Sequence, residues 1–389
     1  MLDFTFYNPV RIVFGEKALN SLPDMLKKYG ATKILLHYGS GSIKENGAYD
    51  AITALLSENG YQYFELGGVQ PNPRITLIRE GAKLCKEKGI DFILAIGGGS
   101  VIDSAKGIAA GAKVDYDIWE HYTQRKPFTD AIPLGVVLTI AAAGSETSAA
   151  SVVSDPETNT KRPAAGEAVI AKFAIMNPVF TMSLPARQTA NGACDIIAHL
   201  LERYFTTVAN VDFTDRLLES AVRSVLYNAP IAIRDPKNYA ARAELMWAGT
   251  VAHNGLLGTG RMGDWGSHDI GHELSGFYDL AHGTTLSILF PAWMKYVYKS
   301  NPAKFVQFAQ RVFDVDIAAD QVDDIVNEMI LRLETFFVSI GLPTRLSEVG
   351  IDDSRFVEMA QSALRNRPKV GNYLDLHEED IVAIYRLAL

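Results

Sequence analysis

The sequence predicts an α/β domain with a mostly parallel sheet over residues 1–185, followed by an all-helical domain over residues 186–389. The first half alternates short apolar runs with helical patterns, whereas the second half has long helical periods and no convincing strand. The pattern changes near Leu184 and Pro185. A length of 389 residues also exceeds what one small core would fill.

Four apolar strands and the helices between them define the first half. The earliest strand, residues 33–38, ends at a glycine- and serine-rich turn, and a helical pattern follows at 49–59. The other strands are expected at 61–66, 91–96 and 133–139, and the other helices at 75–88 and 101–112. Parallel strands that alternate with helices are buried on both faces, so we expect helices on either side of the sheet.

The second half shows helical apolar spacing at 191–204, 212–227, 239–257, 302–313 and 320–340. Cys85 and Cys194 are the two cysteines of the chain, and both lie in apolar helical patterns. A disulfide framework is therefore not expected, and a cytoplasmic location is predicted.

The composition indicates a small-molecule partner. Apolar residues make up 48% and charged residues 21% of the chain, which is typical of a soluble globular protein. The 37 basic and 45 acidic residues leave a net charge of −8, which argues against nucleic acid and anionic lipid as partners. No apolar run reaches membrane-spanning length, and residues 1–15 do not resemble a secretory leader.

Asp195 and His199 are the first candidate metal ligands. They lie four residues apart in a helical pattern, so both side chains project from one face and can hold one ion. The remaining ligands are expected among His268, His272 and His282. Nitrogen and oxygen ligands suit zinc or iron(II). The alternative is a capping or salt-bridged Asp–His pair on a helix surface.

Two glycine-rich turns follow strands of the first half. Residues 97–100 separate a strand from a helix, where backbone N–H groups and the helix dipole favour a pyrophosphate. The alternative is a plain tight turn, because Ile102 stands where the common dinucleotide fingerprint has its third glycine. A second such turn at 39–42 favours nucleotide binding. It offers no acidic residue for a ribose hydroxyl, and Lys44 lies close by, so NADP(H) is favoured over NAD(H).

Short motifs occur in a shared order along nearly the whole chain. They lie at Phe14 and Gly15, 38–44, 71–73, 95–103, 138–139, 144–146, 192–195, 268–274 and 282–283. Together they resemble the iron-activated (group III) alcohol dehydrogenases, and most closely the branch of butanol dehydrogenases and NADPH-dependent aldehyde reductases. The resemblance implies a Rossmann-like dinucleotide-binding domain, a helical metal-binding domain, the architecture of dehydroquinate synthase, and a homodimer.

The resemblance also implies roles for individual residues. The metal ligands of the family, one aspartate and three histidines, match Asp195, His199, His268 and His282. His272 matches a histidine that lies near the substrate without binding the metal. The family's cofactor contacts match Gly39, Ser40, Ser42, Gly97, Gly98, Gly99, Ser100, Asp103, Thr139 and, in a loosely aligned loop, Lys161.

Two positions depart from the pattern of the branch. Ala143 stands where close relatives usually have threonine, which removes one hydroxyl near the nicotinamide. Ser40 stands where many relatives have glycine. Both changes bear on coenzyme preference and substrate range rather than on the reaction class.

The implied reaction is hydride transfer between NAD(P)H and short- to medium-chain aldehydes or primary alcohols. Iron(II) is the expected metal, with zinc as an alternative, because either ion can polarise a carbonyl oxygen. His272 is expected either to pass a proton to the alkoxide or to orient neighbouring groups.

Three other functions share part of these features. A polyol dehydrogenase of the glycerol type is a near relative. A lyase like dehydroquinate synthase would need basic residues for a phosphorylated sugar acid, and residues 261–285 offer only Arg261. A dinucleotide sensor without catalysis should have lost some metal ligands, whereas the chain keeps all of them.

Overall fold

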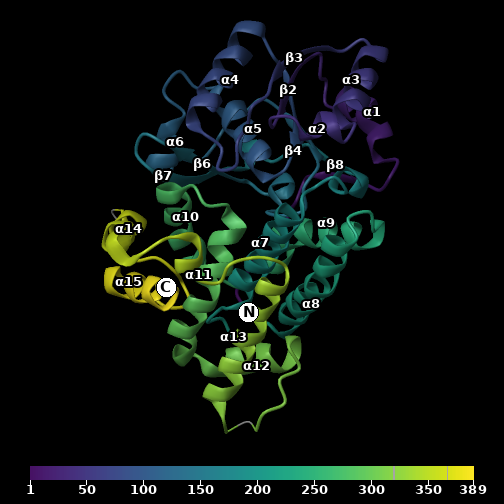
Figure 1. The fold of residues 1–389 in the computed structure, drawn as a ribbon. Coiled ribbons are helices and arrows are strands. Elements are labelled where there is room, and N and C mark those ends of the chain that lie inside the picture. Colours follow the sequence, from purple (N-terminus) through teal and green to yellow (C-terminus); the bar gives the residue numbers. More distant parts are fainter. Residues whose placement is uncertain (319, 366) are drawn as a thin grey trace. The chain divides into compact units, whose positions relative to one another are not determined.

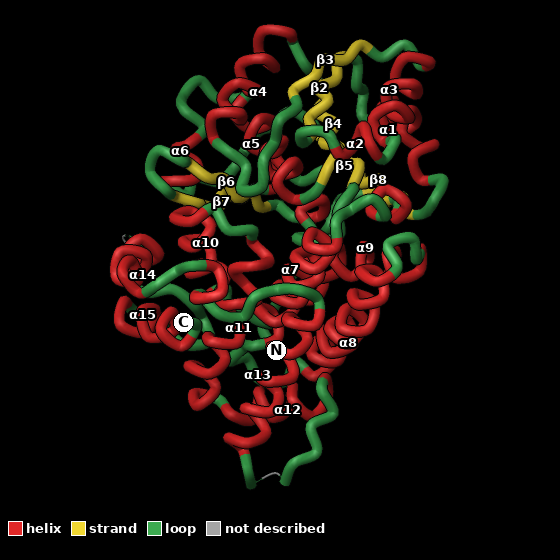
Figure 2. Tube along the Cα trace, in the orientation of Figure 1, coloured by secondary structure: helices red, strands yellow, loops and turns green. Residues whose placement is uncertain are grey.

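The computed structural model describes residues 1–318, 320–365 and 367–389, and the chain forms two compact units (Figure 1). The α/β unit comprises Tyr7–Pro185 and Asp235–Asn254, and the helical unit comprises Met1–Phe6, Ala186–Arg234 and Gly255–Leu389. The strands belong to the α/β unit, as the yellow segments in Figure 2 show. The predicted fold class, a parallel-sheet α/β domain followed by a helical domain, is confirmed.

A six-stranded parallel sheet forms the centre of the α/β unit, with strand order β1–β8–β5–β4–β2–β3. The strands are β1 (Arg11–Phe14), β2 (Lys33–Tyr38), β3 (Gln62–Leu66), β4 (Phe92–Gly97), β5 (Leu134–Leu138) and β8 (Phe173–Met176). Every residue of the neighbouring strands β4 and β5 is buried. Burial on both faces explains the continuous apolar runs by which these strands were predicted.

Helices cover both faces of this sheet, as expected. The helices of the unit are α1 (Leu22–Lys28), α2 (Ser42–Glu45), α3 (Ala48–Glu58), α4 (Ile75–Lys88), α5 (Gly99–Gly111), α6 (Trp119–Thr123) and α9 (Tyr239–His253). On one face, Ile78 of α4 and Ile108 of α5 share a core with Ala95. On the other face, α1 and α3 pack through Leu26 and Ile52.

Four strands of this unit were not predicted from the sequence. β1 and β8 have four residues each, and β6 (Ala150–Asp155) pairs with β7 (Thr160–Ala165) in an antiparallel hairpin. The hairpin is rich in small and polar residues and contains Pro163, so its sequence has little strand propensity. Tertiary contacts fix it instead, since Asp103 Oδ2 accepts a hydrogen bond from Val152 N at 2.9 Å.

Two segments lie outside the expected division at residue 185. α9 belongs to the α/β unit, where Met246 joins the core and Thr250 Oγ1 donates to Glu146 Oε1 at 2.6 Å. Met1–Phe6 belongs to the helical unit, where Leu2 N donates to Gly260 O at 2.8 Å. Helical periodicity reveals a buried face but not the element on which that face packs, so the sequence did not assign α9.

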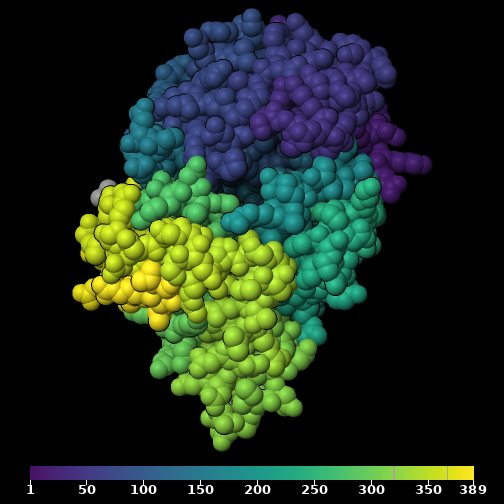
Figure 3. All heavy atoms as spheres, in the orientation of Figure 1, coloured from purple at the N-terminus to yellow at the C-terminus, as the bar shows by residue number. Residues whose placement is uncertain are grey.

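The helical unit is arranged around a central buried helix, α7. Its helices are α7 (Ala186–Tyr204), α8 (Asp212–Arg234), α10 (Gly266–Tyr278), α11 (His282–Val297), α12 (Pro302–Val312), α13 (Val322–Ser339), α14 (Phe356–Leu364) and α15 (Glu378–Leu387). Every residue of α7 from Gly192 to Tyr204 is buried, and the helix packs on α8 and α11. The C-terminal helices α14 and α15 lie side by side at the surface of the unit (Figures 1 and 3). None of the helices in the described ranges is long and apolar enough to cross a membrane.

We expect the buried ring of His37 in β2 to make the stability of the α/β unit pH-dependent. Its Nδ1 lies 2.8 Å from Leu66 O, and its Nε2 lies 2.8 Å from Ser104 Oγ. Because a carbonyl oxygen can only accept, Nδ1 carries the proton and Ser104 Oγ donates to Nε2. Burial lowers the pKa of His37 from 6.5 to about 4.

As the pH falls from 6.5 towards 4, the unfolded chain binds a proton at His37 that the folded chain excludes. The free energy of unfolding therefore decreases, by roughly 3 kcal/mol from this residue across the window. His37→Gln does not titrate, so its stability should fall less between pH 7 and pH 4.5. Chemical unfolding at both pH values measures the difference, and equal losses in the two proteins would contradict the prediction.

Candidate active site

Helix α7 positions Asp195 and His199 one helical turn apart. Both side chains are buried, and His199 Nε2 lies 3.4 Å from Asp195 Oδ1. The spacing that suggested a shared face in the sequence therefore brings the two side chains together. A surface salt bridge, the alternative considered for this pair, would be exposed.

Helices α10 and α11 bring two more histidines to this pair. Ligand atoms of Asp195, His268 and His282 all lie within 4.8 Å of one another, and His282 Nε2 is 3.7 Å from Asp195 Oδ1. The ring centroids of His199 and His268 are 4.8 Å apart. His272 lies at the side of the group, with its ring centroid 5.4 Å from that of His282. The structure thus gathers the five predicted residues of the helical unit in one place.

The donor set fits a divalent metal ion. His268 Nδ1 is 2.7 Å from Glu202 Oε1, whereas His268 Nε2 is buried and makes no hydrogen bond. A buried ring nitrogen in this state is available as a metal ligand. Three imidazoles and one carboxylate form a set that zinc and iron(II) both accept. Asp195, His268 and His282 therefore form a candidate metal site, next to which His199 lies.

Glu202 is a residue of this site that was not identified from the sequence. Its carboxylate is fully buried and accepts hydrogen bonds from the first residues of α10. The sequence did indicate its location in one way: Glu202 follows His199 by three residues, which places both side chains on adjacent turns of one helix face. An acidic residue in that position is more often paired at a surface, so the signal was weak.

Gly283 allows α11 to approach α7 closely. A Cβ at this position would lie 2.2 Å from Asn191 O and 2.7 Å from Asn191 Cα, which is closer than non-bonded atoms can come. Thr284 Oγ1 strengthens the same contact by donating to Asn191 Oδ1 at 2.8 Å. This approach brings the preceding residue, His282, beside Asp195.

Gly283→Ala should therefore destabilise the helical unit and displace His282. Overpacking of this kind costs about 1–3 kcal/mol, and we expect metal affinity to fall with it. Gly258→Ala is the matched control, because a Cβ there would have its nearest neighbour at 3.8 Å. Denaturant unfolding and zinc titration of both variants test the prediction, and a Gly283→Ala protein with unchanged stability and affinity would refute it.

The glycine triplet lies where β4 meets the N-terminus of α5. Gly97 ends the strand, Gly98 precedes the helix and Gly99 begins it, and Ser100 lies in the first turn. A Cβ at Gly97 would come within 2.5 Å of Val101. This close contact with the Val101 side chain leaves the first N–H groups of a 13-residue helix at the end of the sheet. This geometry suits a pyrophosphate.

Predicted cofactor residues around this turn already have protein partners. Asp103 Oδ1 accepts from Ser145 Oγ at 2.5 Å, and its Oδ2 accepts from the β6 backbone. Lys161 is buried, and its Nζ donates to Asn72 Oδ1 at 3.0 Å. Thr139 N donates to Gly97 O at 3.1 Å. In this structure the Asp103 carboxylate holds the loop that follows β5 rather than pointing freely from the turn.

The second glycine-rich turn, Gly39 to Ser42, follows β2 and leads into α2. The nearest acidic group of the adjoining strand β3 is Glu65, whose two carboxylate oxygens accept from Tyr38 at 2.7 Å and from Tyr49 at 2.9 Å. Lys44 Nζ lies 4.9 Å from the centroid of the Tyr49 ring. Glu65 is thus engaged by tyrosines, and an ammonium group stands beside the turn.

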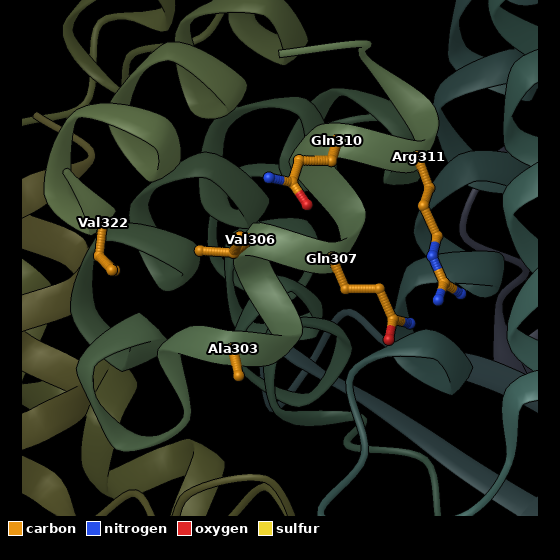
Figure 4. A pocket seen from close by; sticks show the side chains of 6 residues that line it. All are labelled: Ala303, Val306, Gln307, Gln310, Arg311 and Val322. Carbon is orange, nitrogen blue, oxygen red and sulfur yellow. The ribbon is translucent and has the colours of Figure 1, made fainter. Parts of the chain in front are cut away.

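A cavity of about 410 Å³ lies elsewhere in the helical unit, on α12 and the start of α13 (Figure 4). It is lined by Ala303, Val306, Gln307, Gln310, Arg311 and Val322. None of the predicted site residues lines it. The chemistry of the histidine cluster therefore does not extend to this cavity.

Two sequence profiles together match most of the chain. Residues 9–178 match the profile described as "Iron-containing alcohol dehydrogenase". Residues 189–389 match the profile described as "Fe-containing alcohol dehydrogenase family, C-terminal". The interval between the two matches, residues 179–188, runs from the end of the α/β sheet into the start of α7.

Individual proteins are similar over nine tenths or more of the chain. The probable NADH-dependent butanol dehydrogenase 1 of Bacillus subtilis is 42% identical over 389 residues, with 100% of both chains covered. The NADPH-dependent aldehyde reductase YqhD of Escherichia coli is 37% identical over 358 residues, 91% of each chain. The crystal structure of NADH-dependent butanol dehydrogenase A from Thermotoga maritima has a TM-score of 0.96 at 35% identity, with 100% of this chain and 99% of that chain covered.

Proposed function

Because this chain belongs to the iron-containing alcohol dehydrogenase family, we propose that it reduces short- to medium-chain aldehydes to primary alcohols with NAD(P)H, and catalyses the reverse reaction. The observation that carries the proposal is the group of Asp195, His268 and His282, whose ligand atoms lie within 4.8 Å of one another. A buried group of this kind suits a metal-dependent oxidoreductase rather than a plain structural core.

We propose that Asp195, His199, His268 and His282 hold the metal, with iron(II) favoured and zinc as the alternative. Such an ion supplies Lewis acidity, which polarises a substrate carbonyl and favours hydride addition at its carbon. The chain's own contribution is to hold four side chains from α7, α10 and α11 in fixed directions. Burial of Asp195, His199 and His268 excludes water that would compete for the same ion.

The two glycine-rich turns are proposed to bind the dinucleotide. The residues concerned are Gly39, Ser40, Ser42, Gly97, Gly98, Gly99, Ser100, Asp103, Thr139 and Lys161. NADP(H) is favoured because Lys44 stands beside the first turn and Glu65 is engaged by two tyrosines. The relatives include NADH-dependent and NADPH-dependent enzymes, so NAD(H) remains the alternative. Equal kcat/KM values with NADH and NADPH would refute a preference.

His272 is proposed to deliver the proton that completes the alcohol. It lies on the same helix as His268, one turn later, and its ring is tilted against that of His282. Imidazole titrates near neutral pH, as a proton donor here requires. We expect His272→Asn to bind metal as the wild type does but to lower kcat and alter its pH profile. An unchanged pH profile at unchanged kcat would remove this role.

The decisive experiment is an assay of the metal-free protein reloaded in turn with iron(II), zinc and other divalent ions. We expect steady NADPH consumption with butanal only after metal addition. Faster turnover with glycerol would favour a polyol dehydrogenase. Conversion of a phosphorylated sugar acid with no net change in the cofactor would favour a lyase. Cofactor binding without turnover of any substrate would favour a sensor. Light scattering tests the homodimer that we propose for the assembly.

A further inference from the structure

We propose that Glu202 is a positioning residue that sets the direction of His268 before any metal binds. The inference deepens the proposed metal-dependent function and rests on it. Glu202 lies on α7, three residues after His199, and its carboxylate is fully buried in the helical unit. A buried carboxylate is costly unless its oxygens accept enough hydrogen bonds, so each of its contacts is informative.

One oxygen of Glu202 is directed at His268. Glu202 Oε1 accepts from the ring Nδ1 of His268 at 2.7 Å and from the backbone N of the same residue at 3.1 Å. Ser267 Oγ donates to the same oxygen at 3.0 Å. A carboxylate only accepts, so the proton of a neutral His268 ring sits on Nδ1. Nε2 is then left as the ligand nitrogen, and it is the atom that is buried without a hydrogen bond.

The other oxygen of Glu202 fixes the backbone from which His268 projects. Glu202 Oε2 accepts from Trp265 N, the residue that precedes α10. Trp265 has a φ of 68°, a left-handed conformation that is unfavourable for a bulky side chain and needs support from its surroundings. Its indole ring contacts the rings of His199 and His268, with centroids at 5.8 Å and 5.3 Å. The two oxygens together therefore hold the ring and the start of its helix.

Asp264 provides a comparison within the same turn. It is also buried, and its carboxylate accepts from the backbone N–H groups of Gly266 at 3.0 Å and of Asn372 and Tyr373 at 2.7 Å each. Both carboxylates thus stabilise the start of α10 through its otherwise unpaired N–H groups. Glu202 differs because it also contacts an imidazole of the metal site. Comparing Asp264 with Glu202 therefore distinguishes stabilisation of the start of α10 from orientation of the His268 ring.

The chemical consequence follows from the hydrogen bond at Nδ1. A carboxylate that accepts from the far nitrogen of a metal-binding imidazole fixes its tautomer and raises the basicity of the ligand nitrogen. Glu202→Gln keeps the volume of the side chain but replaces one acceptor oxygen with an amide that donates. That amide meets either the ring Nδ1 or Trp265 N, both of which are donors in the present arrangement.

The test compares Glu202→Gln with Asp264→Asn, with zinc as the probe. Metal-free wild type and both variants are titrated with zinc in competition with a chromophoric chelator, and unfolding midpoints are measured on the same samples. We expect Glu202→Gln to lose about 10- to 100-fold in zinc affinity. Asp264→Asn should be less stable than the wild type but keep its zinc affinity within about threefold. The reason is that the loss of zinc affinity expected for Glu202→Gln comes from the contact with the His268 ring, which Asp264 does not make.

A second measurement uses the folded wild type alone. In ¹⁵N spectra of histidine-labelled, metal-free protein, with His268→Ala used to assign the signal, we expect His268 to be protonated at Nδ1 and not at Nε2. Protonation at Nε2, equal zinc affinities of wild type and Glu202→Gln, or an equal loss in Asp264→Asn would each overturn the role of Glu202. A wild type that binds no zinc and no iron(II) would instead overturn the metal-dependent function, and the inference with it.

Discussion

Replacing His268 with alanine is expected to lower kcat/KM for aldehyde reduction about a thousandfold, because metal polarisation of a carbonyl contributes several kcal/mol to the stability of the transition state. In the His268 ring, Nε2 is buried without a hydrogen bond, and Nδ1 is held by Glu202. Its removal leaves Asp195 and His282 without the third member of the cluster. We expect metal content, measured by elemental analysis after gel filtration, to fall with activity.

His377→Ala is the matched control for this prediction. His377 is exposed at the start of α15, and its Nδ1 lies 2.9 Å from Pro368 O. Its loss should weaken a helix cap by about 1 kcal/mol and leave metal content and kcat/KM unchanged. A His268→Ala protein that retained full metal content and activity would show that the metal binds elsewhere.

Replacing Lys106 with methionine is expected to destabilise the α/β unit by about 3–5 kcal/mol. This is the usual cost of removing one member of a buried set of interacting charges. Lys106 lies on α5 with none of its surface exposed. Its Nζ donates to four oxygens of the loop before β6 and of the first β6 residue: Ser145 O, Ser145 Oγ, Ser148 O and Ala150 O, at 2.7–2.9 Å. Methionine fills similar space but cannot donate, so all four hydrogen bonds from the Lys106 ammonium would be lost.

Removing the positive charge of Lys106 adds to this expected loss of stability. Burial lowers the pKa of Lys106 to about 8, and the carboxylates of Asp103 and Glu146 act in the opposite direction. Burial also raises the pKa of both carboxyls, while the Lys106 ammonium lowers it. Without the ammonium, both buried carboxyls would lose a stabilising positive charge.

The control for Lys106→Met is the same substitution at Lys83. The Lys83 side chain on α4 is 75% exposed in an ion pair with Glu87, and such pairs contribute little. Denaturant midpoints of the two variants should therefore differ widely, with Lys83→Met within about 0.5 kcal/mol of wild type. We also expect weaker NADPH binding by Lys106→Met, because the loop that it anchors follows the strand next to the glycine triplet. Equal midpoints for the two variants would contradict the prediction.

The sequence predicted those parts of the fold and site that depend on local spacing. The apolar runs of β4 and β5 and the period of α4 follow from burial patterns a few residues long. Asp195 and His199 could be paired because both lie on one helix. The cluster of His268, His272 and His282 indicated where the other ligands lie, and the resemblance to a family selected His268 and His282, since periodicity alone does not indicate which helices pack together.

The remaining features depend on contacts between distant segments. Glu202 has its role only because the chain turns at Trp265 with a left-handed backbone and returns to α7. Asp103 follows the glycine triplet, and its place in the sequence did not indicate that its carboxylate is bound by Ser145 and the β6 backbone. The β6–β7 hairpin was missed for the same reason, since β6 packs on α5, a contact between distant segments that its own residues do not indicate.

The complete burial of α7 from Gly192 to Tyr204 limits how this enzyme can be redesigned. A library that randomises this helix would return mostly insoluble chains, because nearly every position must fit neighbours on all sides. Attempts to widen the range of accepted molecules should therefore leave α7 intact.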